Sequence, residues 1–125
     1  MIKVPSFLLK RLYVKGSLSN NERGFQFQIE NKLGSGYGKE MKPLTLDGEE
    51  IPLDDATFEQ DSVETLFSRV NPDNPFTLPM NKRMTVRVKG ITLSEGNHKI
   101  GMAFVAEGLG QLGFEVIDVV ARENT

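Results

Sequence analysis

The sequence predicts an all-β protein: an antiparallel, immunoglobulin-like β-sandwich of seven to nine strands, forming a single domain over residues 1–125. Apolar and polar residues alternate over 84–89, and the alternation resumes over 100–104 and again over 112–116. Gly and Asn break these runs, and no long segment shows the 3.6-residue period of a helix. Period-two runs that end in turn residues are typical of antiparallel strands joined by tight turns.

The N-terminal part is predicted to form a β-hairpin. Residues 8–18 alternate in polarity and form its first strand. The turn at 20–24 is rich in Asn and Gly, which tolerate positive φ. Residues 25–30 alternate most regularly of all and form the return strand.

Shorter features are predicted in the middle of the chain. Residues 34–38 contain three Gly and form a mobile hairpin loop, since the motifs of a P-loop and of a dinucleotide-binding βαβ unit are both missing around them. Residues 44–51 form a hairpin that turns at Asp47-Gly48. Residues 62–67 form a short helical turn capped by Ser62, and 71–75 form a loop.

One hydrophobic core is expected from the apolar residues that share the period-two phasing. Its predicted members are Leu12, Val14, Phe25, Phe27, Ile29, Val86, Val88, Ile100, Met102, Phe104, Phe114 and Val116.

Composition argues against several functional classes. The chain contains no Cys, so disulfides, Cys-zinc sites, iron–sulfur clusters and thiol catalysis are excluded. A net charge of −2 argues against nucleic acid as a partner. No segment approaches the roughly 20 apolar residues of a membrane span, and Lys10 and Arg11 end the apolar N-terminal stretch too early for a signal peptide. We therefore expect a soluble cytoplasmic protein with no membrane partner and no cofactor.

The candidate site residues are few. His98 is the only histidine, and a lone His at a strand entry is more often bonded to turn backbone than catalytic or metal-binding. Asp54 and Asp55 lack the ligand order of a calcium loop. Asp118 has the phase of an inward-facing residue, yet a bulge after Val116 or the end of the sheet is expected to place it at the rim. If the protein is an enzyme, its weak candidate residues are His98, Asp118, Asp54 and Asp55. No catalytic, cofactor-binding or metal-binding residue is assigned.

Opposite charges are segregated along the chain. Eight acids and no base lie between residues 43 and 68, whereas eight bases stand against three acids over 3–42. The ordinary interpretation is a solvated surface, and the functional one is a pair of poles that orient a partner. Ile117 and Val119 make the second face of the last strand apolar as well, so another subunit is expected to cover it. We expect a homo-oligomer, a complex with a larger enzyme subunit, or both.

Three motifs resemble the small β subunit of C-glycoside deglycosidases. They are Gly24-Phe25-Gln26-Phe27-Gln28-Ile29, Leu46-Asp47-Gly48-Glu49-Glu50-Ile51-Pro52 and Leu93-Ser94-Glu95-Gly96-Asn97-His98-Lys99-Ile100, within residues 24–105. The resemblance implies a β-sandwich whose chemistry sits mainly on a larger, metal-dependent, barrel-type partner subunit.

The N-terminal stretch is similar to a group of short microbial proteins, some of which are labelled hydroxymethylglutaryl-coenzyme A reductase. The similarity rests on Pro5-Ser6-Phe7-Leu8-Leu9-Lys10-Arg11-Leu12-Tyr13-Val14-Lys15-Gly16-Ser17-Leu18. The chain is far shorter than that reductase and shows neither a nicotinamide-binding βαβ unit nor a Lys/Glu/Asp/His catalytic set. No catalytic residue is carried over from either resemblance.

The expected function is a non-catalytic accessory or interaction subunit of a complex that metabolises sugars or small molecules. One alternative is a small β-sandwich hydrolase or isomerase that uses carboxylates with His98. Another is a carbohydrate-binding module, although the chain has no Trp and only two Tyr to stack on sugars. The sequence names no substrate, partner or oligomeric state, and it assigns no role to the acidic segment 47–64.

Overall fold

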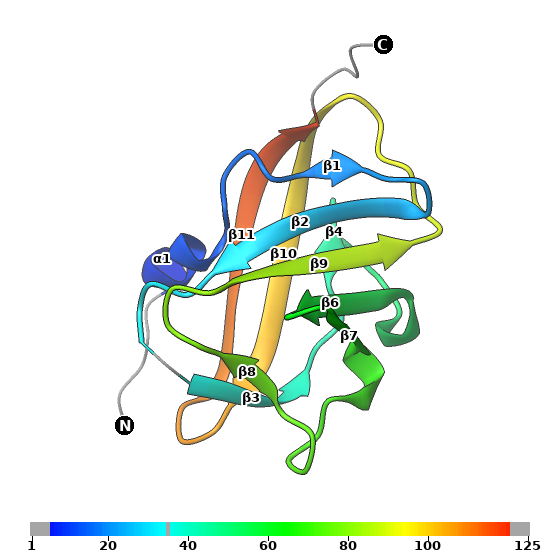
Figure 1. Ribbon diagram of the computed structural model, residues 1–125. Helices are drawn as coiled ribbons and strands as arrows, with labels where there is room; N and C mark the ends of the chain where they lie inside the picture. Colours follow the sequence, from blue (N-terminus) through cyan, green and yellow to red (C-terminus); the bar gives the residue numbers. More distant parts are fainter. Residues whose placement is uncertain (1–5, 35, 121–125) are drawn as a thin grey trace.

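The protein consists mostly of β-strands arranged in two open antiparallel sheets with one hydrophobic core (Figure 1). The computed structural model describes residues 6–34 and 36–120. The fold is mostly β, and the two sheets are consistent with a β-sandwich. The expected immunoglobulin-like topology is not shown by the strand order, and the described residues form eleven strands rather than seven to nine because several strands are only two or three residues long.

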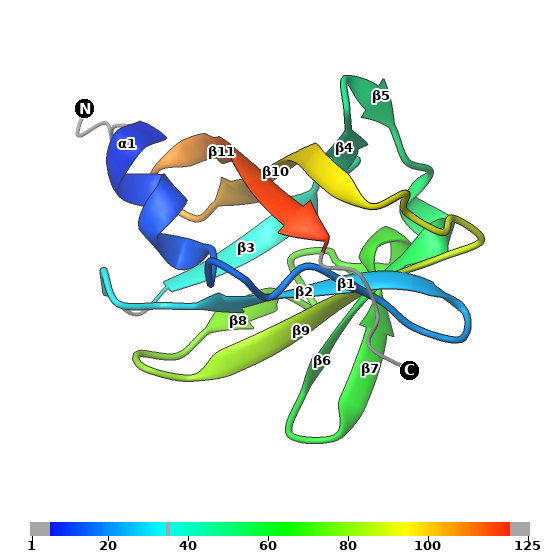
Figure 2. The same cartoon turned by 90° about the horizontal axis from the view of Figure 1, so that it is seen from above.

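The two layers are named sheet A and sheet B, and Figure 2 shows them from above. In spatial order, sheet A contains β1 (Ser19–Asn20), β2 (Gly24–Glu30), β9 (Arg83–Lys89), β6 (Ala56–Gln60) and β7 (Val63–Leu66). Sheet B contains β5 (Glu49–Glu50), β4 (Thr45–Leu46), β10 (Gly96–Ala106), β3 (Gly36–Met41) and β8 (Phe76–Leu78), and β11 (Gly110–Val120) pairs with β10 on its other side.

Two predicted hairpins are confirmed. β4 and β5 pair around a turn in which Asp47 has φ 51° and Gly48 has φ 89°, and a left-handed pair of this kind is what Asp-Gly supplies at low cost. β10 and β11 pair without interruption from Gly96↔Val120 to Ala106↔Gly110. This long hairpin forms the centre and one edge of sheet B.

The predicted first strand over 8–18 is wrong. The chain there forms a helical turn, α1 (Ser6–Leu9), followed by a 3₁₀ turn, η1 (Lys10–Leu12), and an irregular segment. Leu9 and Leu12 are both buried, and residues three positions apart share a helix face. This helical spacing decides the local structure, and the alternation that suggested a strand is coincidental.

The predicted mobile hairpin loop at 34–38 is also wrong. Gly36 begins β3, and the segment carries the chain from sheet A to sheet B instead of returning along β2. Gly38 is buried in β3, where an added Cβ would lie 3.3 Å from ring atoms of both Phe76 and Phe104. The absence of a side chain at Gly38 therefore allows the two aromatic rings to pack closely against the backbone of β3.

The helical turn predicted at 62–67 is a strand for most of its length. Asp61 and Ser62 both have positive φ, 52° and 68°, and form the tight turn between β6 and β7. Ser62 is therefore a turn residue and not a helix cap. A 3₁₀ turn, η3, begins only at Phe67, and another, η2 (Leu53–Asp55), precedes β6.

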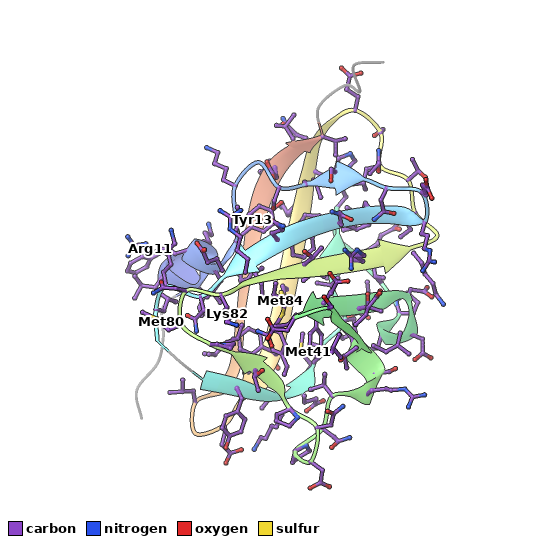
Figure 3. All side chains as sticks on the ribbon, in the orientation of Figure 1. Arg11, Tyr13, Met41, Met80, Lys82 and Met84 are labelled. Atoms are coloured by element: carbon purple, nitrogen blue, oxygen red, sulfur yellow. The ribbon has the colours of Figure 1, made fainter. Side chains whose placement is uncertain are left out.

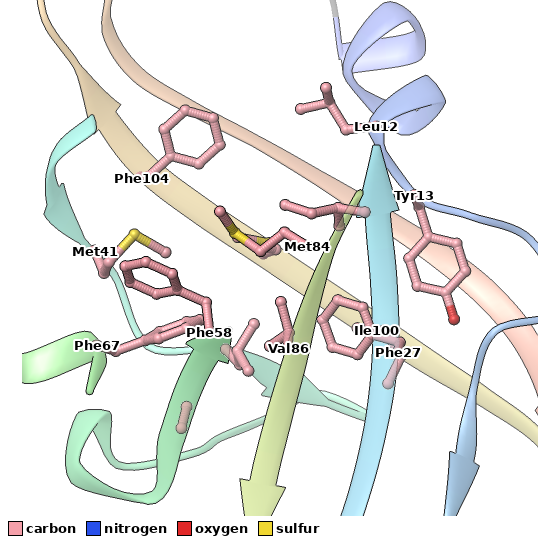
Figure 4. Close-up of a cluster of buried hydrophobic side chains, with 14 of the residues drawn as sticks. Leu12, Tyr13, Phe27, Met41, Phe58, Phe67, Met84, Val86, Ile100 and Phe104 are labelled. Atoms are coloured by element: carbon pink, nitrogen blue, oxygen red, sulfur yellow. The ribbon is translucent and has the colours of Figure 1, made fainter. Parts of the chain in front are cut away.

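The core lies between the two sheets and is rich in aromatic side chains (Figure 4). Phe58 and Phe76 stack edge to face with ring centroids 4.9 Å apart, and Phe104 continues the stack at 5.6 Å from Phe76. Most predicted core residues are buried, but Val14 and Val116 are only half-buried. The irregular N-terminal segment and the sheet edge explain these two exceptions. Among the described residues no helix is long and apolar enough to cross a membrane.

Candidate functional site

His98 lies at the start of β10 and contacts two turns. Its Nδ1 lies 2.7 Å from Oδ2 of Asp47, and its Nε2 lies 2.8 Å from the carbonyl oxygen of Ser94. The other carboxylate oxygen of Asp47 accepts the backbone N–H of Lys99 at 2.8 Å. The three side chains Asp47, His98 and Ser94 thus occur in the order of a hydrolytic triad, with Oγ of Ser94 3.4 Å from Nε2.

The hydrogen bonds do not suit nucleophile activation. Both ring nitrogens of His98 face oxygen acceptors, so both carry protons in the geometry observed. The bond to Asp47, followed by the bond to the Ser94 carbonyl, raises the pKa of His98, with burial opposing them. A general base must accept the serine proton at Nε2, and this nitrogen is already a donor. The structural interpretation of His98 is the one that the geometry supports.

The pKa of Asp47 is lowered, first by the Lys99 N–H and then by the bond to His98. Through these hydrogen bonds, Asp47 and His98 connect the β4–β5 turn to the turn before β10. Asp47 was predicted as a turn residue only, and nothing in the sequence pairs it with His98, 51 positions away.

Asp118 is buried, so its predicted place at the rim is wrong. It is 5% exposed, and β11 continues without a bulge to Val120. Its Oδ2 accepts the Tyr13 hydroxyl at 2.7 Å and the backbone N–H groups of Gly16 and Leu18 at 3.1 and 3.3 Å. Hydrogen-bond donors from the N-terminal segment satisfy this carboxylate, and this explains why the Asp118 side chain can point into the protein interior.

Tyr13 completes this cluster from the other side. Its ring packs 5.4 Å from that of Phe27 (Figure 4), and Figure 3 labels Tyr13 on the whole structure. Its hydroxyl donates to Asp118. Burial, and then the bond to Asp118, raise the pKa of the Tyr13 hydroxyl. On the opposite side, the Val14 N–H donates to the Gln28 carbonyl at 2.9 Å. Residues 13–18 therefore connect β2 of sheet A to β11 of sheet B, and we call them the N-terminal strap.

Asp54 and Asp55 lie elsewhere, in the 3₁₀ turn before β6. Together with other polar residues they line an open groove of about 560 Å³ on the outer face of sheet A. The groove also holds Glu59 and Glu64, which are direct cross-strand partners. Arg87 pairs with Glu59 at 3.0 Å, and the Thr57 hydroxyl donates to Glu64 at 2.6 Å.

The predicted candidates do not assemble into one site. His98 and Asp118 are cross-strand partners in β10 and β11, yet the hydrogen bonds of each go to other residues. Asp54 and Asp55 belong to the groove of sheet A. Within residues 6–34 and 36–120, no three His, Cys, Asp or Glu side chains are grouped so that they could hold a metal ion.

The outer face of sheet B has a different character. Ile117 and Val119 project from β11 with 63% and 54% of their surface exposed. Further along the same face the positions Gly101, Ala103 and Gly113 carry little or no side chain. Two shallow hollows, of about 550 and 510 Å³, open on this face.

Comparison with known protein families identifies a match for most of the chain. The family described as hydroxymethylglutaryl-CoA reductase, N-terminal domain, matches residues 8–121. The chain belongs to this family. No curated protein matches it. The N-terminal similarity noted in the sequence is therefore confirmed at the level of the family, whereas the resemblance to the deglycosidase β subunit receives no support from these comparisons.

For this member of the reductase N-terminal domain family, sequence reasoning located His98 and Asp118 but missed their partners. Tyr13 was counted only as one of the two tyrosines available to stack on sugars, although a Tyr beside a strand and an inward-phased Asp can form a buried pair. Three lysines that line the hollow beside β11 were also missed. They lie at positions 10, 15 and 99, and the sequence gives no signal that brings them together.

Proposed function

We propose that the chain is a non-catalytic interaction module that docks onto a larger enzyme of sugar or small-molecule metabolism through the outer face of sheet B. The observation that carries the proposal is the exposure of Ile117 and Val119, neighbours on one face of β11. Two large aliphatic side chains that project together from a sheet are typical of a surface that a partner covers.

The shape of the same face supports docking. The hollow beside Gly101, Ala103 and Gly113 adjoins the projecting side chains, because the two hollows share Lys10 and Glu115. A docked partner would therefore contact the projecting side chains of Ile117 and Val119 and the adjacent hollow on one surface. Shape complementarity of this kind, with an apolar centre and a polar rim, is usual in protein interfaces.

The family name and the sequence resemblance suggest two kinds of enzyme. The family description places such domains at the N-terminus of a reductase, so the catalytic part of a hydroxymethylglutaryl-CoA reductase is one candidate partner. The resemblance to the deglycosidase β subunit suggests a barrel-type sugar enzyme instead. In both cases the catalytic chemistry belongs to the partner, and this domain contributes assembly.

Matched surface variants test the docking face. Ile117→Lys should abolish association while the isolated chain stays folded. Val63→Lys is the control, since Val63 is 64% exposed on β7 of sheet A and so is comparably accessible. Light scattering over a concentration series measures self-association, and capture from an extract of the source cells, with the captured proteins identified, measures association with an enzyme.

The proposal predicts that Ile117→Lys loses the identified enzyme and Val63→Lys retains it. If the wild-type chain stays monomeric and captures no enzyme, or if both variants lose the enzyme equally, docking through sheet B is wrong.

A second candidate function is hydrolysis in the groove of sheet A. It is favoured by Glu59 and Glu64, two carboxylates that face each other across β6 and β7 beside Arg87. A carboxylate pair is the usual apparatus of glycoside hydrolysis. Turnover of an aryl glycoside that disappears in both Glu59→Gln and Glu64→Gln would establish this function, and turnover unchanged in either variant would exclude it.

A further inference from the structure

Ion pairing divides the lysines of the described residues into two groups. Five of these eight lysines have their ammonium group within 4 Å of an acidic side chain. They are Lys32, Lys39, Lys42, Lys82 and Lys89. The other three, Lys10, Lys15 and Lys99, form no such pair among residues 6–34 and 36–120.

These three lysines all line the same hollow of about 550 Å³ on the outer face of sheet B. They come from separate parts of the chain: Lys10 from η1, Lys15 from the N-terminal strap and Lys99 from β10. The lysines that lack acidic partners among the described residues thus gather around one hollow.

Among the residues that the structure describes, Glu115 is the one acid that lines the hollow with them. Asp47 also lies close enough to Lys99 for the lysine charge to contribute to its lowered pKa, although no ion pair forms between the side chains. Three ammonium groups therefore outnumber the acidic groups that line the hollow. Val116 and Ile117 add an aliphatic wall, which lowers the local polarity and strengthens the field of the lysines.

The backbone positions of two of the lysines are constrained by hydrogen bonds to aspartate side chains. The strap that carries Lys15 is attached to Asp118 through Tyr13, Gly16 and Leu18, and Tyr13 itself lines the hollow. Lys99 lies on the central strand of sheet B and bonds Asp47 through its backbone N–H. The backbone around the hollow is thus organised before any ligand arrives, which reduces the entropy cost of binding.

We propose that this lysine hollow binds a multivalent small anion, a molecule that carries phosphate or several carboxylate groups. Ammonium groups bind such anions as point charges without strict geometry, so either kind of group satisfies the site. The aliphatic wall provides contact for a short carbon chain attached to the charged group. This site overlaps the proposed docking face at Ile117, but anion binding does not depend on the docking function.

The test uses inorganic pyrophosphate and citrate as probes, titrated into the full chain at an ionic strength of about 0.15 M, where long-range attraction between exposed charges is screened. Calorimetry gives the affinity, and backbone amide NMR shifts locate the site. We expect saturable binding of at least one probe, with shifts concentrated around residues 10–18, 97–101 and 115–117.

Two triple variants carry equal changes in charge. Lys10→Gln/Lys15→Gln/Lys99→Gln should weaken binding by roughly tenfold or more, since it removes all three ammonium groups that line the hollow. Lys32→Gln/Lys39→Gln/Lys42→Gln is the matched control and should change the affinity by less than roughly twofold, because those lysines lie outside the hollow.

Comparison of the two probes shows which anion class the site prefers. The proposal is wrong if neither probe saturates, if the amide shifts spread over the surface, or if the control triple variant loses as much affinity as the hollow variant. All six positions are on the surface, so thermal unfolding should show both variants folded. If the hollow variant is unfolded, Lys15→Gln alone replaces it, and unchanged affinity in that variant would also overturn the proposal.

Discussion

The outer faces of the two sheets differ more than their shared core suggests. On sheet A, Arg87 pairs with Glu59 at 3.0 Å and Arg83 lies 3.5 Å from Glu30, so the charges of neighbouring strands neutralise each other. On sheet B, the exposed Ile117 lies among lysines that have no described acidic partner. Among the described residues, the outer face of sheet A therefore carries cross-strand ion pairs, whereas the outer face of sheet B carries exposed aliphatic side chains next to lysines without acidic partners.

The difference shows why an alternation pattern is a poor guide to function. Both sheets alternate along their strands, and both place apolar residues inward. What distinguishes the outer faces is whether the charged groups find partners across the strands, and strand order alone decides that. The candidate surfaces therefore follow from unpaired groups rather than from the residue types by themselves.

The largest expected effect concerns the core that the two sheets share. Phe27→Ala in sheet A and Phe114→Ala in sheet B should each cost about 3–5 kcal/mol of unfolding free energy, because both rings are buried and leave a cavity. Urea unfolding measures the cost. Similar losses of unfolding free energy in the two variants would mean that the sheets differ only on their outer faces. A small loss in either variant would show that its sheet does not contribute to the shared core.

The next effect concerns the strap that crosses from sheet A to sheet B. Tyr13→Phe keeps the ring but removes the bond to Asp118, and hydrogen bonds to charged groups are worth about 1.5–3 kcal/mol. We expect that loss in urea unfolding at neutral pH. Tyr37→Phe is the control, since Tyr37 is half exposed on sheet B and none of its described hydrogen bonds involves the hydroxyl. Equal losses in the two variants would contradict a specific role for the strap.

A third prediction uses pH to test the turn contacts on the sheet B side. The pKa of His98 is raised, so its contribution is complete below its ordinary value of 6.5 and is lost as pH rises through the raised pKa. The pKa of Asp47 is lowered, so its contribution is complete above its ordinary value of 3.8 and is lost as pH falls through the lowered pKa. The pair therefore stabilises most between these two ordinary values.

His98→Gln should lower the unfolding free energy by about 1 kcal/mol within that window, the upper range for an ion pair with an exposed partner. The difference from wild type should shrink toward alkaline pH. Urea unfolding at several pH values measures it, with Asp47→Asn as a second variant of the same pair. A difference that is constant with pH would show that packing, and not the charge of His98, accounts for the loss.

The smallest effects belong to the outer faces themselves. Arg87→Gln breaks one ion pair on sheet A and should cost no more than about 1 kcal/mol. Ile117→Gln on sheet B should change the stability of the isolated chain by less than about 0.5 kcal/mol, since the side chain is mostly exposed. Thermal unfolding measures both. A large loss for Ile117→Gln in a monomeric sample would mean that the residue supports the fold rather than a partner.

The sequence by itself determined the class of the protein and its most regular hairpins. Strict alternation and turn residues are local signals, so β2, β9 and the long β10–β11 hairpin were predictable from spacing alone. The Asp47-Gly48 turn was predictable for the same reason, since positive φ restricts the residue types that fit. The same alternation failed over 8–18, where two buried leucines three residues apart favour a helical turn.

Only the tertiary structure decided the sites, because each is made by residues that are distant in the chain. Asp118 could be buried because donors from the N-terminal strap, about a hundred positions earlier, satisfy its carboxylate. The charge of His98 depends on Asp47 from another hairpin, and the lysine hollow depends on which cations find partners after the sheets form. The hydrogen-bond partners and charge state of a buried polar side chain are properties of the assembled structure, and a local sequence pattern does not specify them.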